Sequence, residues 1–338
     1  MNKQIVFSKK DTAELWDIEY KKPGINQASV ETHFSAISSG TEKANITGNP
    51  NISSVPNAPV VFPRYLGYSS SGIVKEVGEN VTHIAPGDRV IVFHGQHKKY
   101  NTLSADNVVK IPYDDIPLEE AALIFITTFP LAAIRKTRLE ISESALVMGL
   151  GILGQFAIKF LKAAGAAPII AADLLEERRQ SALSLGADYA FDPADPDFAE
   201  KVKNVSGGGV NVCIEVTGVG AGLDSVLDCM ARFGRVALLG CTRDKNFTID
   251  YYKKIHWPGI TLIGAHTQAR PDQESHQGYY THRDDILATL KLLNMKRITL
   301  SDMIKEIHSP KECGEVYERL INEKNFPCAV LFDWRDIK

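Results

Sequence analysis

Residues 145–154 read Ala-Leu-Val-Met-Gly-Leu-Gly-Ile-Leu-Gly, a short apolar run that leads into three closely spaced glycines. Residues 155–164 then have the apolar spacing of a helix, and a second apolar run over 169–172 ends in Asp173. A strand, a glycine turn, a helix and a second strand closed by an acid are, in this order, what a dinucleotide-binding βαβ unit requires. The alternative interpretation is a glycine-rich turn in another kind of α/β protein.

The three glycines have separate expected roles in such a unit. Gly149 permits the tight turn, Gly151 lets the backbone approach a pyrophosphate, and Gly154 lets helix and strand pack closely. The N–H groups at the start of the helix and the positive end of its dipole favour the phosphates. The predicted coenzyme-binding residues are Gly149, Gly151, Ile152, Leu153, Gly154, Asp173, Thr217 and Gly240.

The acid that closes the unit carries a prediction about the coenzyme. Asp173 can accept hydrogen bonds from both hydroxyls of an adenosine ribose and would repel a 2′-phosphate, so NAD is expected rather than NADP. Arg178 and Arg179 follow within about a helical turn and could weaken that preference. The alternative for both arginines is a solvated helix surface.

The composition is that of an ordinary globular protein. The chain has 338 residues, of which 44% are hydrophobic and 23% charged, which suits about two domains. The net charge of −3 gives no general attraction to nucleic acid or to an anionic membrane. Neither a signal peptide nor an apolar run long enough for a membrane span is found. We therefore expect a cytoplasmic protein with a small-molecule substrate and no nucleic-acid or membrane partner.

The order of predicted elements indicates two kinds of architecture. Residues 1 to about 115 are β-rich, with predicted strands at 27–37, 72–77, 88–93 and 107–111. Strands then alternate with helices, and the predicted strands are 145–148, 168–172, 189–191, 212–215, 235–239 and 261–264. Among the predicted helices are 176–185, 222–230, 284–293 and 311–322. This alternation predicts a parallel, doubly wound α/β sheet with helices on both faces, and a last strand at 328–332 that returns to the N-terminal β domain.

Several short motifs occur together and in order. They are Ser39-Gly40-Thr41-Glu42, Leu66-Gly67-Tyr68, Ser71-Gly72-Ile73-Val74, Gly87-Asp88-Arg89-Val90, the glycine turn and Gly234-Arg235-Val236. With them the chain resembles the medium-chain dehydrogenase/reductase superfamily, which includes zinc alcohol, sorbitol and threonine dehydrogenases. The resemblance implies a GroES-like catalytic domain (1–118 and 267–338), a Rossmann NAD-binding domain (119–266) and an active site in the cleft between them. It also suggests a homodimer or homotetramer.

The zinc ligands of that family are replaced in this chain. Ser39 stands for a cysteine, Tyr68 for a histidine, Ser69 for a glutamate and Phe125 for the last ligand. None of these side chains is a ligand that Zn²⁺ prefers. The lobe that holds a structural zinc is also missing, and the five cysteines form no CxxC pair. We therefore predict an enzyme with neither catalytic nor structural zinc; the alternative is a site rebuilt on His94 and His97.

Without zinc, another group must exchange a proton and stabilise charge on the reacting oxygen. Tyr68, at a former ligand position, is the predicted proton donor or oxyanion stabiliser; the alternative is a ring that only fills the space of the metal. Thr41 matches the proton-relay hydroxyl of the family, and Ser39 is expected to join it. The alternative role of both hydroxyls is turn capping.

His266 follows the last Rossmann strand and is the remaining catalytic candidate. It is predicted to contact substrate or exchange protons, and the alternative is a loop histidine bonded to backbone. The polar segment 269–281 beside it is either a lid over a polar substrate or a solvated connector.

Three functions follow from these residues. The first is a zinc-independent, NAD-dependent oxidoreductase that interconverts a secondary alcohol and a ketone, with a polyol or sugar-like substrate preferred. The second is an NAD(P)H-dependent ene or quinone reductase that uses a tyrosine as its proton donor. The third is a nucleotide-binding relative that has lost catalysis together with its metal.

Overall fold

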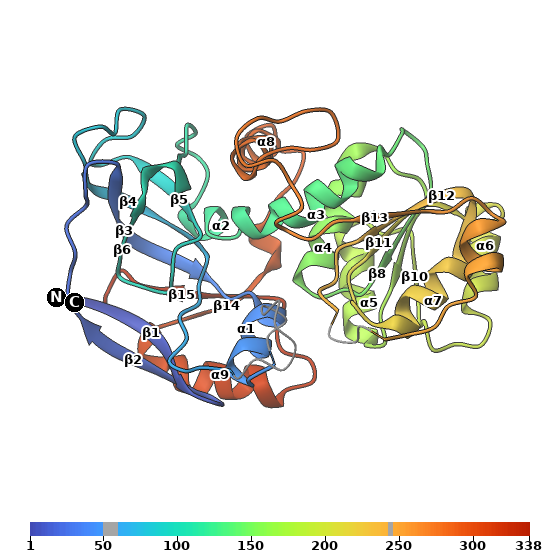
Figure 1. The fold of residues 1–338 in the computed structure, drawn as a ribbon, viewed down its shortest axis with the longest axis horizontal. Coiled ribbons are helices and arrows are strands. Elements are labelled where there is room, and N and C mark those ends of the chain that lie inside the picture. The colour runs from blue at the N-terminus through green and yellow to red at the C-terminus, as the bar shows by residue number, and fades with distance from the viewer. Residues whose placement is uncertain (50–59, 243–245) are drawn as a thin grey trace. The chain divides into compact units, whose positions relative to one another are not determined.

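The computed structural model describes residues 1–49, 60–242 and 246–338, which divide into two compact units. One unit comprises Met1–Ile126 with Ile286–Lys338, and the other comprises Thr127–Asp285 (Figure 1). These divisions lie further along the chain than the predicted ones at 118/119 and 266/267. The second difference has a physical cause, because residues of 267–285 are bonded within the second unit, as shown below.

The second unit contains a six-stranded parallel sheet. Its order is β10-β9-β8-β11-β12-β13, so the chain runs outward to one edge from β8 and then returns to build the other half. This is the strand order of a Rossmann fold, and it confirms the predicted doubly wound sheet. The strands are β8 (Ala145–Met148), β9 (Ile169–Ala172), β10 (Tyr189–Phe191), β11 (Val210–Glu215), β12 (Met230–Leu238) and β13 (Thr261–Gly264).

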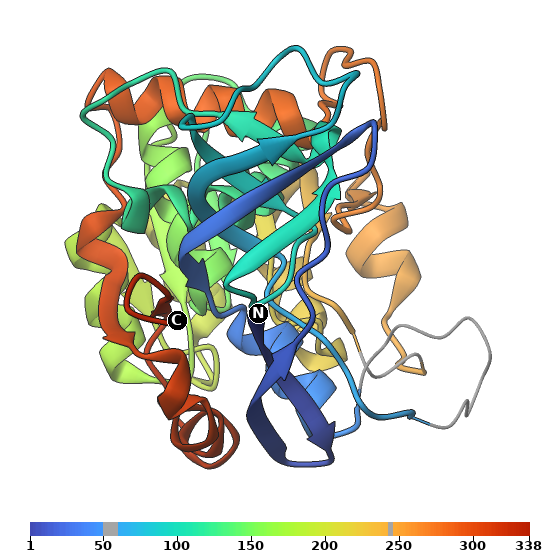
Figure 2. The same ribbon diagram turned by 90° about the vertical axis from the view of Figure 1, so that its left-hand side faces the viewer.

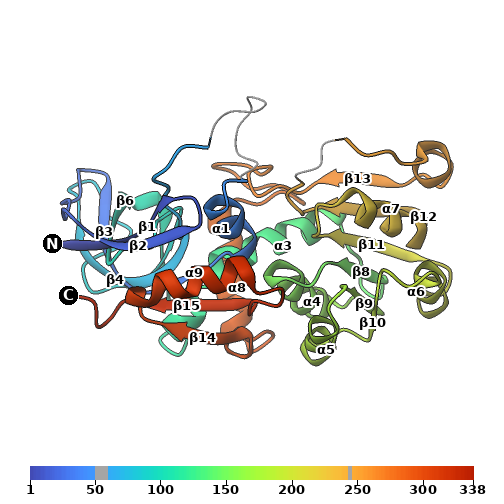
Figure 3. The same cartoon turned by 90° about the horizontal axis from the view of Figure 1, so that it is seen from below.

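Helices connect these strands (Figure 3). They are α4 (Ile152–Ala164), α5 (Glu176–Leu185), α6 (Phe198–Ser206) and α7 (Gly220–Cys229), and α3 (Ile124–Thr137) enters the unit from its N-terminal side. Leu146, Ile170 and Val236, from three strands, belong to one buried cluster with apolar residues of α6 and α7. Burial of this apolar surface stabilises the parallel arrangement.

The first unit is built on a seven-stranded sheet. Along its main path the order is β14-β15-β3-β4-β5-β7, and β6 also pairs with β3. The strands are β3 (Gln27–Ala36), β4 (Ser69–Val77), β5 (Arg89–Phe93), β6 (Tyr100–Ser104), β7 (Val108–Lys110), β14 (Ile304–His308) and β15 (Ala329–Asp333). The antiparallel pairing of β15 with β3 confirms the predicted return of the last strand. Both chain ends lie in this unit (Figure 2).

A two-stranded sheet and several helices complete the first unit. The strands are β1 (Asn2–Lys9) and β2 (Thr12–Ile18), and the helices are α1 (Ser39–Ile46), α2 (Leu118–Ala121), α8 (His282–Asn294), which begins in the second unit, and α9 (Cys313–Asn322). The Ser39-Gly40-Thr41-Glu42 motif forms the first turn of α1. Among the described residues, no helix is both long enough and apolar enough to span a membrane.

Candidate functional site

The turn between β8 and α4 has the geometry expected of its glycines. Gly149 has a φ of +95°, a backbone conformation that residues with a Cβ rarely adopt. A Cβ on Gly154 would lie 1.9 Å from the Gly149 carbonyl oxygen, so only glycine allows this approach of helix to turn. Gly151 is the N-cap of α4, makes no side-chain cap, and has open space where a Cβ would stand. The turn thus leaves a helix N-terminus uncapped by protein side chains, which suits a pyrophosphate.

Asp173, at the end of β9, is engaged with this turn. Its Oδ2 accepts a hydrogen bond from the Leu150 N–H at 2.8 Å, and its Oδ1 accepts one from the Leu175 N–H at 2.9 Å. The Arg178 Nη1 lies 3.8 Å from Asp173 Oδ2, and the buried Nε of Arg178 has no hydrogen-bond partner. Arg179 instead donates to the Asp173 carbonyl oxygen at 2.7 Å. The carboxylate therefore holds the glycine turn, and its contact with a ribose stays a prediction.

Thr217 and Gly240 lie beyond the carboxyl ends of β11 and β12, next to the glycine turn. The Thr217 methyl is 3.0 Å from the place of a Cβ on Gly149, and a Cβ on Gly240 would lie 2.2 Å from the Gly218 nitrogen. The Thr217 N–H donates to Glu215 Oε1 at 2.8 Å, and burial raises the pKa of Glu215. This edge, where the strand order reverses, is where open parallel sheets bind ligands. The sequence reasoning did not single out Glu215.

Tyr68, in the first unit, is partly buried and lies just before β4. Its phenol donates a hydrogen bond to the Ser38 hydroxyl, and its ring packs edge-on against Phe125 with centroids 5.6 Å apart. Burial raises the pKa of Tyr68 to about 12; hydrogen bonds with Ser38 and Thr41 partly offset the rise, and the Glu42 carboxylate adds to it. At neutral pH the phenol is therefore protonated and can act as a proton donor.

The other former ligand positions do not suit a metal. Ser69 is fully buried and donates its hydroxyl to the Ala122 carbonyl oxygen at 2.6 Å. Phe125 is 1% exposed, and its ring packs against Phe93 and His94 with centroids 5.4 and 5.0 Å away. Because an aromatic ring and a hydroxyl already bonded to backbone are poor donors for Zn²⁺, the residues present do not fit a catalytic zinc.

In the alternative metal site on His94 and His97, the ring of His97 is already hydrogen-bonded through both nitrogens. The Nδ1 of His97 is 2.7 Å from Ser35 Oγ, and its Nε2 is 3.2 Å from Glu42 Oε2, so both ring nitrogens are used. His94 is exposed and has a left-handed backbone conformation, with a φ of +56°. No group of three metal-binding side chains occurs within residues 1–49, 60–242 and 246–338.

Of the remaining hydroxyl candidates, Thr41 is hydrogen-bonded to Tyr68. Ser39 is the first residue of α1 and is partly exposed, and its part in a proton relay stays a prediction. The hydroxyl that receives the phenolic hydrogen belongs to Ser38, one residue earlier, which the sequence reasoning missed.

His266 belongs to the second unit and is exposed. Its Nδ1 accepts a hydrogen bond from the Gln268 N–H at 3.2 Å, so the neutral ring carries its proton on Nε2. This contact is the backbone-bonded loop histidine that was the alternative interpretation. A role toward substrate stays a prediction.

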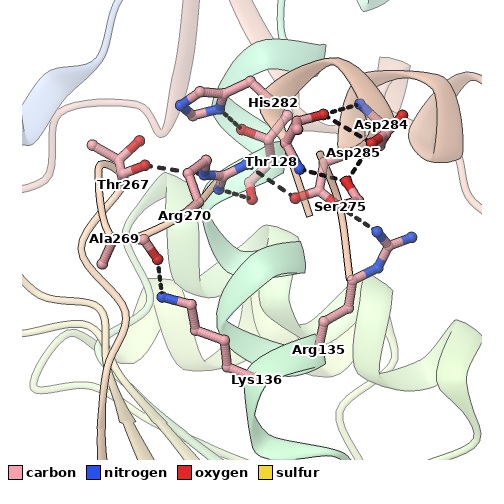
Figure 4. Close-up of polar contacts among 11 residues, drawn as sticks. Thr128, Arg135, Lys136, Thr267, Ala269, Arg270, Ser275, His282, Asp284 and Asp285 are labelled. Atoms are coloured by element: carbon pink, nitrogen blue, oxygen red, sulfur yellow. Dashed lines mark hydrogen bonds and ion pairs between the residues drawn. The ribbon is translucent and has the colours of Figure 1, made fainter. Parts of the chain in front are cut away.

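The polar segment after His266 is fastened to α3 (Figure 4). Arg270 donates to Asp285 Oδ2 at 3.1 Å and to the Thr128 carbonyl oxygen at 3.0 Å, and Arg135 donates to Asp285 Oδ1 at 2.6 Å. Lys136 donates to the Gly264 carbonyl oxygen at 2.9 Å and also to that of Ala269. Asp285 is fully buried, and removal of one partner from such a pair is costly. The segment is therefore bonded within the second unit and is not a solvated connector.

Both units have counterparts among known proteins. A family profile described as alcohol dehydrogenase GroES-like domain matches residues 24–113, and one described as zinc-binding dehydrogenase matches residues 153–277. The chain is 29% identical to (R,R)-butanediol dehydrogenase of Bacillus subtilis over 280 residues, which cover 72% of this chain and 76% of that protein. It is 30% identical to L-threonine 3-dehydrogenase of Pyrococcus furiosus over 285 residues, which cover 75% and 79%. The crystal structure of 2R,3R-butanediol dehydrogenase from Bacillus subtilis has the same fold, with a TM-score of 0.83, 24% identity and coverage of 98% of this chain and 99% of that one.

Proposed function

Because the chain belongs to the zinc-type medium-chain dehydrogenase/reductase superfamily, an NAD(P)-dependent family of oxidoreductases, we propose that it interconverts a secondary alcohol and a ketone without zinc. The observation that carries the proposal is the protonated phenol of Tyr68, hydrogen-bonded to Ser38 at a position where the family places a zinc ligand.

Each unit has its own part in this reaction. The glycine turn and the start of α4 bind the pyrophosphate, and Asp173 orients the adenosine ribose. When bound, the nicotinamide supplies the hydride for the carbonyl carbon and is itself oxidised. Tyr68 donates its proton to the carbonyl oxygen, which becomes the alcohol hydroxyl, and the Ser38 and Thr41 hydroxyls stabilise the phenolate until solvent returns a proton. Each reduction thus consumes one proton.

For the substrate we propose an alcohol with a second polar group beside the reacting carbon, such as a polyol or sugar-like compound. The names of the relatives support this class, because butanediol and threonine both carry a polar group on the carbon next to the alcohol. The sorbitol dehydrogenase of Bacillus subtilis, 29% identical over 217 residues, acts by its name on a polyol.

Reduction of an activated C=C bond is the second candidate, favoured by the same phenol. After hydride addition to an enone, a protonated Tyr68 could deliver the proton to carbon instead of oxygen. A panel of diols, polyols, ketones and enones, assayed in both directions with NAD(H) and NADP(H) under a chelator, separates the two. We expect turnover of vicinal diols or their ketones. Turnover of enones or quinones alone would replace the proposal with the second candidate, and tight coenzyme binding without any turnover would support a silent relative.

For the coenzyme we propose NAD, with Arg178 as the residue that moderates the preference. The Asp173 carboxylate repels a 2′-phosphate, while the positive guanidinium of Arg178, whose Nη1 lies 3.8 Å from Asp173 Oδ2, attracts one. We expect NADH to bind more tightly than NADPH, and Arg178→Ala to weaken NADPH binding by about tenfold, the loss of one charge-assisted hydrogen bond. Fluorescence titration with both coenzymes measures this, and NADH affinity should change little. Tighter binding of NADPH than of NADH by the unaltered protein would contradict the proposal.

A further inference from the structure

We propose that Ser38 and Glu42 are positioning residues for the phenol of Tyr68: the Ser38 hydroxyl accepts the hydrogen bond of the phenol, and Glu42 holds the Ser38 main chain in place. The inference rests on the proposed function of Tyr68 and adds to it two residues that the resemblance does not assign. All contacts that carry it lie within the first unit.

The start of α1 places the Ser38 hydroxyl at the phenol of Tyr68. Ser38 is the N-cap residue of α1. The hydroxyl oxygen of a serine at this position usually accepts a hydrogen bond from a backbone N–H of the first turn. In this helix the Ser38 side chain makes no such bond, and its oxygen instead accepts from Tyr68. The Ser38 N–H donates to Glu42 Oε1 at 2.9 Å, a contact like that of a capping box but one residue longer. Glu42 thus anchors the main chain of the N-cap residue whose hydroxyl bonds the phenol.

The Glu42 side chain is fully buried, with an exposure of 0%. A buried carboxylate is strongly unfavourable unless donors satisfy its oxygens. Tyr317 donates its hydroxyl to Glu42 Oε2 at 2.5 Å, and His97 Nε2 lies 3.2 Å from the same oxygen. With the Ser38 N–H these donors hold the carboxylate in one place, so Glu42 is a fixed support for Ser38.

His97, which contacts Glu42, is held by a hydrogen bond on each ring nitrogen. Trp334 Nε1 donates to Ser35 Oγ at 2.8 Å, and this oxygen is 2.7 Å from His97 Nδ1. A carboxylate only accepts, so His97 Nε2 carries the hydrogen that points at Glu42, and the Nδ1 of the neutral ring accepts from the Ser35 hydroxyl. The hydrogen-bond network therefore assigns the tautomer of His97 that supports the carboxylate.

Ser38 and Glu42 also affect the pKa of Tyr68. The titratable groups near it are Glu42, then His97 and Tyr317 behind Glu42, and His94 on the same Phe125 ring that Tyr68 touches. The negative charge of Glu42 raises the pKa of Tyr68, whereas the Ser38 hydroxyl, which can turn to donate to a phenolate, lowers it. Glu42 and Ser38 therefore shift the pKa of Tyr68 in opposite directions.

The test titrates Tyr68 directly, without a substrate. Ultraviolet difference spectra of the full chain follow phenolate formation, and the titration of Tyr68→Phe identifies the signal of Tyr68. We expect the pKa of Tyr68 to rise in Ser38→Ala and to fall in Glu42→Gln. Ser309, the N-cap of a 3₁₀ turn in the same unit, bonds the Lys311 N–H, and Ser309→Ala is the matched control that leaves Tyr68 unchanged. If neither Ser38→Ala nor Glu42→Gln changes the pKa of Tyr68, the proposal is wrong.

Kinetics provide the second readout once a substrate is found. We expect Ser38→Ala to lower kcat about tenfold with an unchanged KM, and Ser38→Thr to keep most of the kcat of the unaltered protein. In a Tyr68→Phe background, Ser38→Ala should lower kcat no further. An equal loss in both backgrounds would overturn the positioning role. If Glu42→Gln does not fold, the serine variants carry the test. A shifted titration in a protein whose Tyr68→Phe variant is fully active would refute the proposed function and leave the positioning intact.

Discussion

Replacement of Tyr68 by Phe is expected to lower kcat for carbonyl reduction by about 10²- to 10⁴-fold, the usual contribution of a general acid. The ring and its edge-on contact with Phe125 are kept, and only the hydroxyl that reaches Ser38 is lost. Coenzyme affinity should not change, because the glycine turn belongs to the other unit. Steady-state kinetics and NADH titration of the same preparation measure the two effects.

A matched control for this variant is Tyr65→Phe. Tyr65 lies three residues earlier and is 45% exposed, so loss of its hydroxyl should leave kcat unchanged. If Tyr68→Phe has the kcat of the unaltered protein, Tyr68 only fills the space that a metal occupies in relatives, and the proton must come from another group.

Replacement of Gly154 by Ala is expected to weaken NADH binding by about 100-fold and to destabilise the protein without coenzyme by about 1–3 kcal/mol, the usual cost of forcing extra volume into a packed site. The added Cβ would stand 1.9 Å from the Gly149 carbonyl oxygen, so the turn and the start of α4 must separate. That movement displaces the N–H groups that bind the pyrophosphate. Fluorescence titration and thermal unfolding measure the two losses.

Gly151→Ala is the control that separates folding from binding. Gly151 has a φ of −66° and nothing within 4 Å of an added Cβ, so the stability of the protein without coenzyme should stay unchanged. NADH affinity should still fall, because the methyl group would occupy the space of the pyrophosphate. Normal NADH binding by Gly154→Ala would contradict the assigned site.

The Rossmann unit could be predicted almost in full because its signals are local. The strands 145–148, 189–191 and 261–264 and the helix 176–185 were predicted with the bounds that the structure has. Elements of the first unit were missed where the pattern is weak, as in β1, where polar Asn2 and Gln4 are buried together with the continuous run Ile5–Phe7. Helix α1 was not predicted, since Ser39 and Gly40 at its start favour turns and the contact of Glu42 with Tyr317 is a long-range one.

The candidate site was predictable only where a motif marks it. Tyr68 stands out because it replaces a family ligand, and Asp173 because it closes the βαβ unit. Ser38 lies outside the quoted motifs. Glu42 belongs to one of them, but its contact with Tyr317, 275 residues away, could not be read from the motif. The attachment of Arg270 to Thr128 is likewise a long-range contact, and it explains why the predicted boundary at 266/267 differs from that of the structure.

The most direct test of zinc-free chemistry is the metal content of the protein in the preparation whose turnover is measured. We predict no stoichiometric zinc by elemental mass spectrometry and a turnover that prolonged chelation leaves unchanged. One zinc per chain, with turnover that chelation abolishes and added zinc restores, would contradict the proposal and assign to the metal the role that we propose for Tyr68.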